Sequence, residues 1–256
     1  MSAVSIHDGK SVKPVAIMPE ALVTHTAALY GREVYIFGGF SGAIHDAGAS
    51  NKLLVFNVDT FAFRYGTPCP VTMTSHGSAI AGDTLYVGGG YPNTVEGTVI
   101  TAYYAYHIPT DTWTQLPDHP ESFAVSGLFA HHGKIYTFGG ERSTATVHSN
   151  KVHCYDPLSG TWENITPIYG PSGRSCHGVS FDKDSFVIVG GRVGGYAAAP
   201  SAEVWSFNTV TKSWTRLADM LTPVAFCTVL ARNGMLHVTD GYYTNSATIP
   251  GGYLLS

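Results

Sequence analysis

The sequence is poor in charged residues. Only 12% of its 256 residues are Asp, Glu, Lys or Arg, whereas about 25% is typical of a soluble domain. The formal net charge is −4 and the few Lys and Arg residues form no cluster, which argues against a basic face for nucleic acid. No uncharged apolar run approaches the roughly 18 residues that a membrane-spanning helix needs. We therefore expect no nucleic-acid partner and no membrane partner.

Signatures of export and of several catalytic classes are also missing. The four cysteines, Cys69, Cys154, Cys176 and Cys227, form no Cys-x-x-Cys pair. The first twenty residues lack the continuous apolar core of a signal peptide. These two features predict free thiols and a cytoplasmic location. The chain also has no Gly-x-Ser-x-Gly elbow, phosphate-binding loop or His-Glu-x-x-His motif, so no motif indicates a reaction type.

Glycine is abundant, and it recurs with a period. Four apolar stretches end in a glycine pair and a fifth ends in Asp-Gly: 35–39, 86–90, 136–140, 187–191 and 237–241. Their first residues are 51, 50, 51 and 50 positions apart. A fixed period of this length indicates a repeat array. We therefore expect residues 1–256 to form a single domain.

A second feature keeps the same period. An aromatic residue follows each of the four glycine pairs by about half a repeat: Phe61, Trp113, Trp162 and Trp214. The order of apolar strand, Gly-Gly, loop, strand, polar turn and Trp resembles the kelch repeat over nearly the whole chain. The resemblance implies an all-β fold, a five-bladed kelch-type β-propeller with four-stranded antiparallel blades.

The repeats also predict blade boundaries and the way in which the ring closes. The expected blades are about 21–70, 71–120, 121–170, 171–221 and 222–256. The last blade ends at a third strand, while residues 11–18 match the last strand of a repeat and follow a loose arm at 1–9. We expect residues 11–18 to complete the last blade, because this leaves no open sheet edge. We expect the closed ring to be a monomer.

The innermost strand of each expected blade carries one residue ten positions before the apolar stretch. These five, called the register residues below, are His25, His76, Ser126, His177 and Cys227. We expect His25, His76, His177 and Cys227 to line an axial channel, together with Asp240. Imidazole and thiolate are zinc ligands. However, kelch repeats often carry a His here that hydrogen-bonds between blades, so the resemblance favours a structural role, with no metal and no cofactor.

A second set of residues directly follows the glycines: Phe40, Tyr91, Glu141, Arg192 and Tyr242. Repeat symmetry predicts that they surround one mouth of the channel, with Arg174 near the same rim. Aromatic rings beside an acid and two arginines suit a small anionic or sugar-like ligand. The alternative is a Glu141–Arg192 ion pair between neighbouring blades, rimmed by aromatic residues that only pack.

Two classes of function remain open. The first is a non-catalytic binding module that holds a protein or a small ligand on its long loops, as most kelch domains do. The second is an isomerase or lyase similar to the kelch sialate epimerases, with acid–base residues in an axial pocket. The sequence does not decide whether the protein is an enzyme. His131 and His132, in a turn on the opposite face, are expected to be solvated.

Overall fold

The computed structural model describes residues 3–7, 12–41, 48–93, 98–142, 148–195, 197–232, 235–239, 241–244, 247–248 and 253–255. The chain divides into two compact units, Met1–His119 and Pro120–Ser256. The division falls at the expected boundary between the second and third repeats. The described residues are almost entirely β-structure and turns, with one 3-10 helix, η1 (Ile108–Thr110). None of the described helices is long and apolar enough to cross a membrane.

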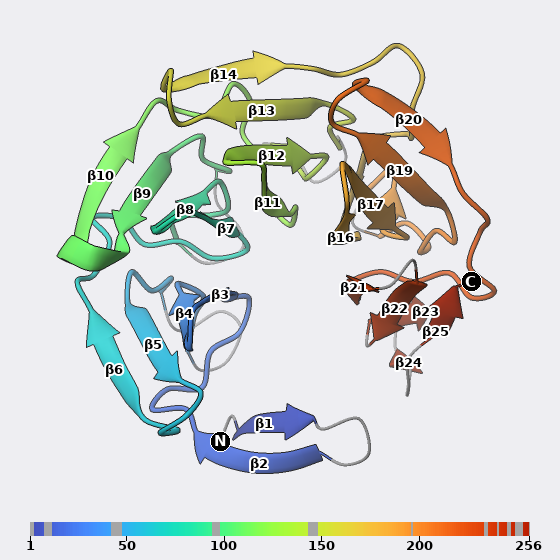
Figure 1. Ribbon diagram of the computed structural model, residues 1–256. Helices are drawn as coiled ribbons and strands as arrows, with labels where there is room; N and C mark the ends of the chain where they lie inside the picture. The colour runs from blue at the N-terminus through green and yellow to red at the C-terminus, as the bar shows by residue number, and fades with distance from the viewer. Residues whose placement is uncertain are drawn as a thin grey trace. The chain divides into compact units, whose positions relative to one another are not determined.

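The first unit contains two four-stranded antiparallel sheets, each formed by consecutive strands (Figure 1). One consists of β3 (Thr26–Tyr30), β4 (Glu33–Phe37), β5 (Leu53–Asn57) and β6 (Phe63–Gly66). The other consists of β7 (Gly77–Ala81), β8 (Thr84–Gly88), β9 (Tyr103–His107) and β10 (Thr112–Leu116). Each sheet corresponds to one expected repeat.

The second unit continues the pattern. One four-stranded sheet consists of β11 (Leu128–His131), β12 (Lys134–Phe138), β13 (Val152–Asp156) and β14 (Thr161–Asn164). The next consists of β16 (Gly178–Asp182), β17 (Ser185–Val189), β19 (Val204–Asn208) and β20 (Ser213–Arg216). A three-stranded sheet consists of β21 (Thr228–Arg232), β22 (Met235–Thr239) and β25 (Tyr253–Leu255). Two short pairs are β15 (Arg174–Ser175) with β18 (Arg192–Val193), and β23 (Tyr242–Thr244) with β24 (Ala247–Thr248).

The repeated Trp packs between its own sheet and the preceding one. Trp214 lies 4.9 Å from Phe207 and 5.3 Å from Phe186 of its own sheet, and 5.0 Å from Phe138 of the preceding sheet, between ring centroids. Trp113 repeats the arrangement in the first unit, with Phe37 of the preceding sheet at 5.3 Å. Because both faces of these sheets are covered, their strands carry apolar residues without strict alternation.

The glycine pairs let the backbone lie close both to the chain that leads to the next sheet and to the segment before the innermost strand of its own sheet. At Gly139, with φ 71°, an added Cβ would lie 2.5 Å from the carbonyl oxygen of Arg174, in the chain that leads to the next sheet. At Gly140, with φ 95°, it would lie 2.8 Å from Cβ of Ser126 in its own sheet. The pair is therefore required both by its positive φ and by close approach.

A feature that the sequence did not reveal is a strained residue before each register residue. The residues at this place in the five repeats all have φ between 53° and 58°: Thr24, Ser75, Val125, Cys176 and Phe226. In the second unit the conformation turns the amide groups of Cys176 and Phe226 toward the preceding repeat. Cys176 N donates to Val125 O at 2.9 Å, and Phe226 N donates to Cys176 O at 2.7 Å. These inter-sheet hydrogen bonds offset a strain of about 1–2 kcal/mol per residue.

The N-terminal segment differs in part from the expectation. Residues 1–9 are not simply a loose arm, because β1 (Ala3–His7) pairs with β2 (Val12–Ile17) in a hairpin. Val4, Val15 and Met18 of this segment pack against buried Ile36, Leu54 and Phe56 of the first unit. At the C-terminus, β25 is the third strand of its sheet, as expected. Closure of a five-bladed ring by residues 11–18 stays a prediction.

Candidate functional site

The residues that follow the glycine pairs lie at one end of their sheets, which we call the Gly-Gly end. Each pairs its backbone with the segment that leads into the innermost strand: Phe40 with Val23, Tyr91 with Thr74, Glu141 with Ala124, and Arg192 with Ser175. Their side chains are therefore covered, with 2–7% of each residue exposed, and they do not form an open rim. Tyr242 begins β23, but its side chain lies outside the described part of the structure, and so does Asp240.

Four polar residues meet at the Gly-Gly end of the second unit. His148 Nδ1 lies 3.1 Å from the carbonyl oxygen of Arg192, and His148 Nε2 lies 3.4 Å from Ser175 Oγ. Glu141 Oε1 lies 4.0 Å from the same Nε2. The Glu141 and His148 side chains are 4% and 1% exposed. We call Glu141, His148, Ser175 and Arg192 the polar cluster.

The polar cluster contains the residue types of a hydrolytic triad in a different geometry. In a triad the carboxylate holds one ring nitrogen while the hydroxyl faces the other. Here Glu141 and Ser175 face the same nitrogen of His148, and a backbone carbonyl occupies the opposite one. Ser175 is also completely buried, so its hydroxyl cannot reach a substrate. The geometry supports a structural role for this cluster.

Burial sets the protonation of the groups around the cluster. It lowers the pKa of His148, against the opposing effect of the Glu141 carboxylate. It raises the pKa of Cys176 to about 12, so this thiol stays protonated at neutral pH. A protonated, buried thiol is a poor nucleophile and a poor metal ligand. At neutral pH the centre of this region is therefore uncharged at His148 and Cys176.

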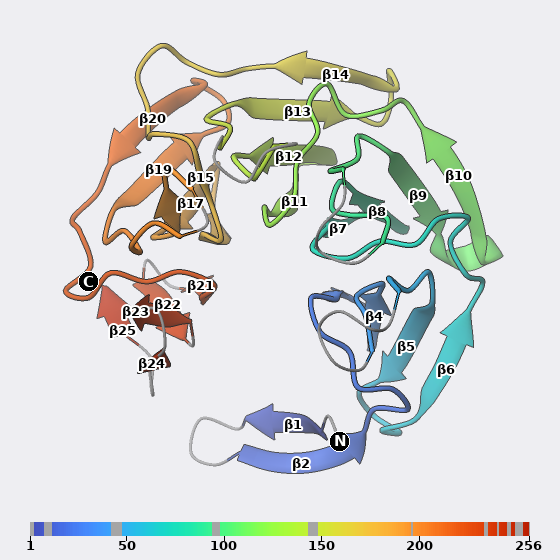
Figure 2. The same ribbon diagram turned by 180° about the vertical axis from the view of Figure 1, so that it is seen from behind.

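Arg174, expected at the rim, is instead completely buried. Its guanidinium donates to Gly190 O at 3.0 Å and to Ser172 O at 3.2 Å, and it forms an ion pair with Glu203 Oε2. These acceptors lie in the loops before β15, after β17 and before β19, and Figure 2 shows β15 beside β17 and β19. Arg174 is a clamp that holds these loops, so it is not available to an external anion.

The sequence contains a signal for this clamp. The residues three positions before the other register residues are apolar: Leu22, Met73, Phe123 and Val224. Arg174 thus occupies a register that is apolar in every other repeat. A buried charge at such a position needs a partner of opposite charge. Glu203, which was not predicted as a site residue, is that partner.

The Arg174 clamp yields the first prediction. Arg174→Leu should lower the free energy of unfolding by about 2–4 kcal/mol, because breaking a buried ion pair leaves unpaired acceptors. This range is below that of fully buried pairs, since the Glu203 side chain is 31% exposed and water screens it. The measurement is urea unfolding at neutral pH.

Arg216→Ala is the matched control. Arg216 lies 3.6 Å from the same carboxylate and also pairs with Asp219, but its side chain is 46% exposed. We expect little loss of stability, because water screens an exposed ion pair. Equal losses in the two variants would contradict the assignment of Arg174 as the clamp.

Three register residues contact the strands that end in the glycine pairs or the strands beside them. His76 Nε2 lies 2.8 Å from Thr26 Oγ1 of the preceding sheet, and its ring fills the space beside Gly38. The ring of His177 lies 5.3 Å from that of Phe138 of the preceding sheet. Ser126 Oγ donates to Phe138 O at 2.6 Å, within its own sheet. His25 is half-buried, and burial lowers its pKa.

The second unit has a hollow along its innermost strands. It has a volume of about 260 Å³ and is lined by β11, β16 and β21, with His177 and Cys227 among the lining residues. Most of the lining is apolar: Leu128, Phe129, Val179, Phe181 and Val229 contribute, with Ser180 and Thr228 as polar members. His177 and Cys227 therefore line a hollow of the second unit, while an axial channel stays a prediction.

The comparisons with known proteins agree with the repeats. Residues 126–168 and 173–221 match the Kelch motif. The chain is 28% identical to human Kelch domain-containing protein 10 over 88% of its own length and 53% of that protein. It is 25% identical to Kelch-like protein 25 of Xenopus tropicalis over 93% of this chain and 40% of that protein. It is 28% identical to Beta-scruin of Limulus polyphemus over 71% of this chain and 21% of that protein.

The chain therefore spans about a fifth to a half of the length of these relatives. Among solved structures, that of YjhT has the same fold, with a TM-score of 0.73 and 18% identity over 88% of this chain and 74% of that one. The matched motif, the periodic glycine pairs and the four-stranded sheets lead to one conclusion: the chain belongs to the kelch-repeat family.

Proposed function

We propose that the chain is a protein-binding module that uses the Gly-Gly end of the second unit. Kelch repeats typically mediate protein binding. The observation that carries the proposal is a group of exposed apolar side chains in the connections at this end: Ile168, Tyr169, Val193, Leu221 and Phe226. Apolar residues gathered on one surface are costly in water and mark interaction sites.

The connection that carries Tyr169 packs against buried aromatic side chains of the neighbouring sheet. Tyr169 packs on Trp205, with 5.6 Å between ring centroids, and the Arg216 guanidinium lies 5.9 Å from the centre of Trp205. Gly170 lies against Trp214, where an added Cβ would be 2.5 Å from the ring. Side chains presented on a pre-organised backbone lose little entropy on binding. Tyr and Arg are also the residue types that most often anchor interfaces.

Of the predicted ligand residues, Arg192 lies directly against the exposed group, but it is itself buried, so we assign it to support. Its guanidinium lies 5.8 Å from the centre of the Phe226 ring, which is part of the exposed group. We assign Phe40, Tyr91 and Glu141 to support beneath the surface, because all three are buried. We also propose that the sheets are blades of a five-bladed propeller, which the sequence period supports.

Burial also argues against the alternative of an isomerase or lyase in this region. Acid–base catalysis needs a group within hydrogen-bond reach of the substrate. The Glu141 and His148 side chains are almost inaccessible, and Arg174 is occupied by its three acceptors. Exposed apolar side chains above buried polar side chains suit protein binding better than acid–base catalysis.

The test compares two leucines of nearly equal exposure. Leu221 at the Gly-Gly end is 94% exposed, and Leu158, in the β13–β14 turn at the opposite end, is 99% exposed. Leu221→Asp should abolish association with a protein partner because it places a charge in the apolar contact, whereas Leu158→Asp should leave it intact. Both variants should fold normally, since exposed positions change stability little.

The measurement is quantitative affinity purification from the source organism. The wild-type chain, the two leucine variants and Ile168→Asp are compared. Proteins that bind the wild type and the Leu158 variant, and not the Leu221 or Ile168 variants, support the proposal. A partner lost only with Leu158→Asp, or one retained by every variant, would place binding elsewhere.

A further inference from the structure

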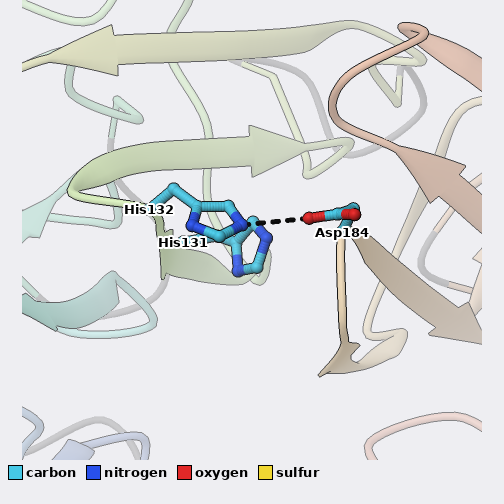
Figure 3. A group of neighbouring side chains, drawn as sticks. All are labelled: His131, His132 and Asp184. Atoms are coloured by element: carbon cyan, nitrogen blue, oxygen red, sulfur yellow. Dashed lines mark hydrogen bonds and ion pairs between the residues drawn. The ribbon is translucent and has the colours of Figure 1, made fainter.

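Three metal-ligating side chains meet at the other end of the second unit, outside the region proposed for protein binding. His131 ends β11, His132 lies in the turn to β12, and Asp184 lies in the β16–β17 turn of the neighbouring sheet. Figure 3 shows the two imidazole rings side by side, with the Asp184 carboxylate turned toward them. His132 Nε2 lies 3.0 Å from Asp184 Oδ1.

Adjacent residues of a strand normally point to opposite faces, and the turn changes this. His132 and Gly133 form a two-residue turn between β11 and β12, with φ of 47° and 73°. The left-handed conformation of His132 brings its ring onto that of His131, with 3.9 Å between centroids. The His131 ring is itself stacked on Phe181, at 4.5 Å and 18°. The backbone and Phe181 therefore orient both imidazoles.

The His131 ring has an unsatisfied group. Its Nε2 atom is buried and has no hydrogen-bond partner among the described residues. A buried polar atom without a partner costs about 1–3 kcal/mol, and such atoms in native structures call for an explanation. A ligand bound between the three side chains would satisfy this atom.

We propose that His131, His132 and Asp184 form a binding site for a divalent transition-metal ion, with Zn²⁺ as the ion that its donors suit. Two imidazoles and one carboxylate are typical zinc ligands. One ligand atom from each residue lies within 4.8 Å of the others. Ligands at about 2.1 Å from a common ion can be at most about 4.2 Å apart.

The ligand atoms need to approach one another only slightly to bind a common ion, and exposed side chains can make this movement. The His132 and Asp184 side chains are 66% and 57% exposed, so they can rotate toward an ion without moving the backbone. Three protein ligands leave further coordination positions for water, as in open zinc sites. The site takes a borderline or soft ion rather than Ca²⁺ or Mg²⁺, which prefer oxygen ligands alone.

A simple ion pair between His132 and Asp184 is the competing explanation, and the chain contains a matched example. In the first unit His107 Nε2 lies 3.4 Å from Asp83 Oδ2, and both side chains are about half-exposed. Asp83 occupies the corresponding turn, between β7 and β8. Among the described residues this pair is not part of a three-residue ligand group. It supplies the control.

The experiment measures Zn²⁺ binding by calorimetry, with untagged protein that has been treated with a chelator. His132→Asn suits the turn, because Asn-Gly is favoured where both residues have positive φ. Asp184→Asn retains the backbone carbonyl that accepts from Thr209. His131→Phe retains an aromatic ring on Phe181. His107→Asn is the control variant.

We expect the wild type to bind Zn²⁺ and not Ca²⁺. His131→Phe, His132→Asn and Asp184→Asn should each weaken Zn²⁺ binding at least tenfold, because each removes one of three ligands, while His107→Asn should bind as the wild type does. The Co²⁺-loaded wild type should show visible absorption that the His131 variant lacks. Absence of Zn²⁺ binding, unchanged affinity in His132→Asn or Asp184→Asn, or an equal loss in His107→Asn would overturn the proposal.

Discussion

Lowering the pH from 7.5 to 5.0 should destabilise both units before most carboxylates titrate. Each unit contains a buried imidazole, His76 in the first and His177 in the second. Burial lowers the pKa of each to about 3, with a further contribution from His25 at His76 and from Arg174 and His148 at His177. Burial also lowers the pKa of His25, His148 and His153.

The sign of the effect follows from proton binding. In the unfolded chain a histidine has a pKa of about 6.5, so below that pH the unfolded state binds a proton that the native state excludes. Stability is therefore complete above pH 6.5 and falls between pH 6.5 and 3, by about 1.4 kcal/mol per pH unit for each buried imidazole. At pH 5.0 each unit should lose about 2 kcal/mol, or about 5–10 °C in Tm.

The measurement is thermal unfolding between pH 5.0 and 7.5, with His177→Leu as the diagnostic variant. Neither nitrogen of His177 has a hydrogen-bond partner among the described residues, so the substitution removes a titrating group without removing a hydrogen bond. The pH dependence of the second unit should then become shallower by about 1.4 kcal/mol per pH unit. An unchanged pH dependence in this variant would show that His177 is not the acid-sensitive group.

Deleting residues 1–19 should lower the stability of the first unit by about 5 kcal/mol and promote aggregation. The segment covers Ile36, Leu54 and Phe56, which are almost completely buried. Burying an aliphatic or aromatic side chain contributes about 1.5–3 kcal/mol, and the deletion also removes the packing of Val4, Val15 and Met18. A loss of this size approaches the total stability of many domains.

Hydrogen exchange of the truncated protein separates the two roles considered for this segment. If it covers the first unit, amides of β4 and β5 should lose protection. If residues 11–18 also complete the last sheet of a ring, amides of β22 and β25 should lose protection as well. A truncated protein with unchanged exchange and an unchanged melting temperature would contradict both roles.

The sequence by itself determined the repeat architecture. The glycine pairs, the Trp that follows them and the period of about 50 residues predicted the strand order of each sheet, and the four-stranded sheets agree. These features are local: a positive φ, a tight hairpin or a covered strand constrains the residues of one repeat in the same way each time. Five-fold closure depends on how separate repeats meet, so it stays a prediction.

Only the tertiary structure decided the environment of individual side chains. Arg174 and Glu203 are 29 positions apart, and His132 and Asp184 are 52 apart, so their pairing depends on how neighbouring sheets pack. Glu141 and Arg192 lie at corresponding ends of their sheets, and repeat symmetry did not predict that the adjoining connections cover them. The reason is physical: a period specifies where a residue lies on its own sheet, whereas burial and pairing depend on the side chains that the next sheet and its loops bring against it.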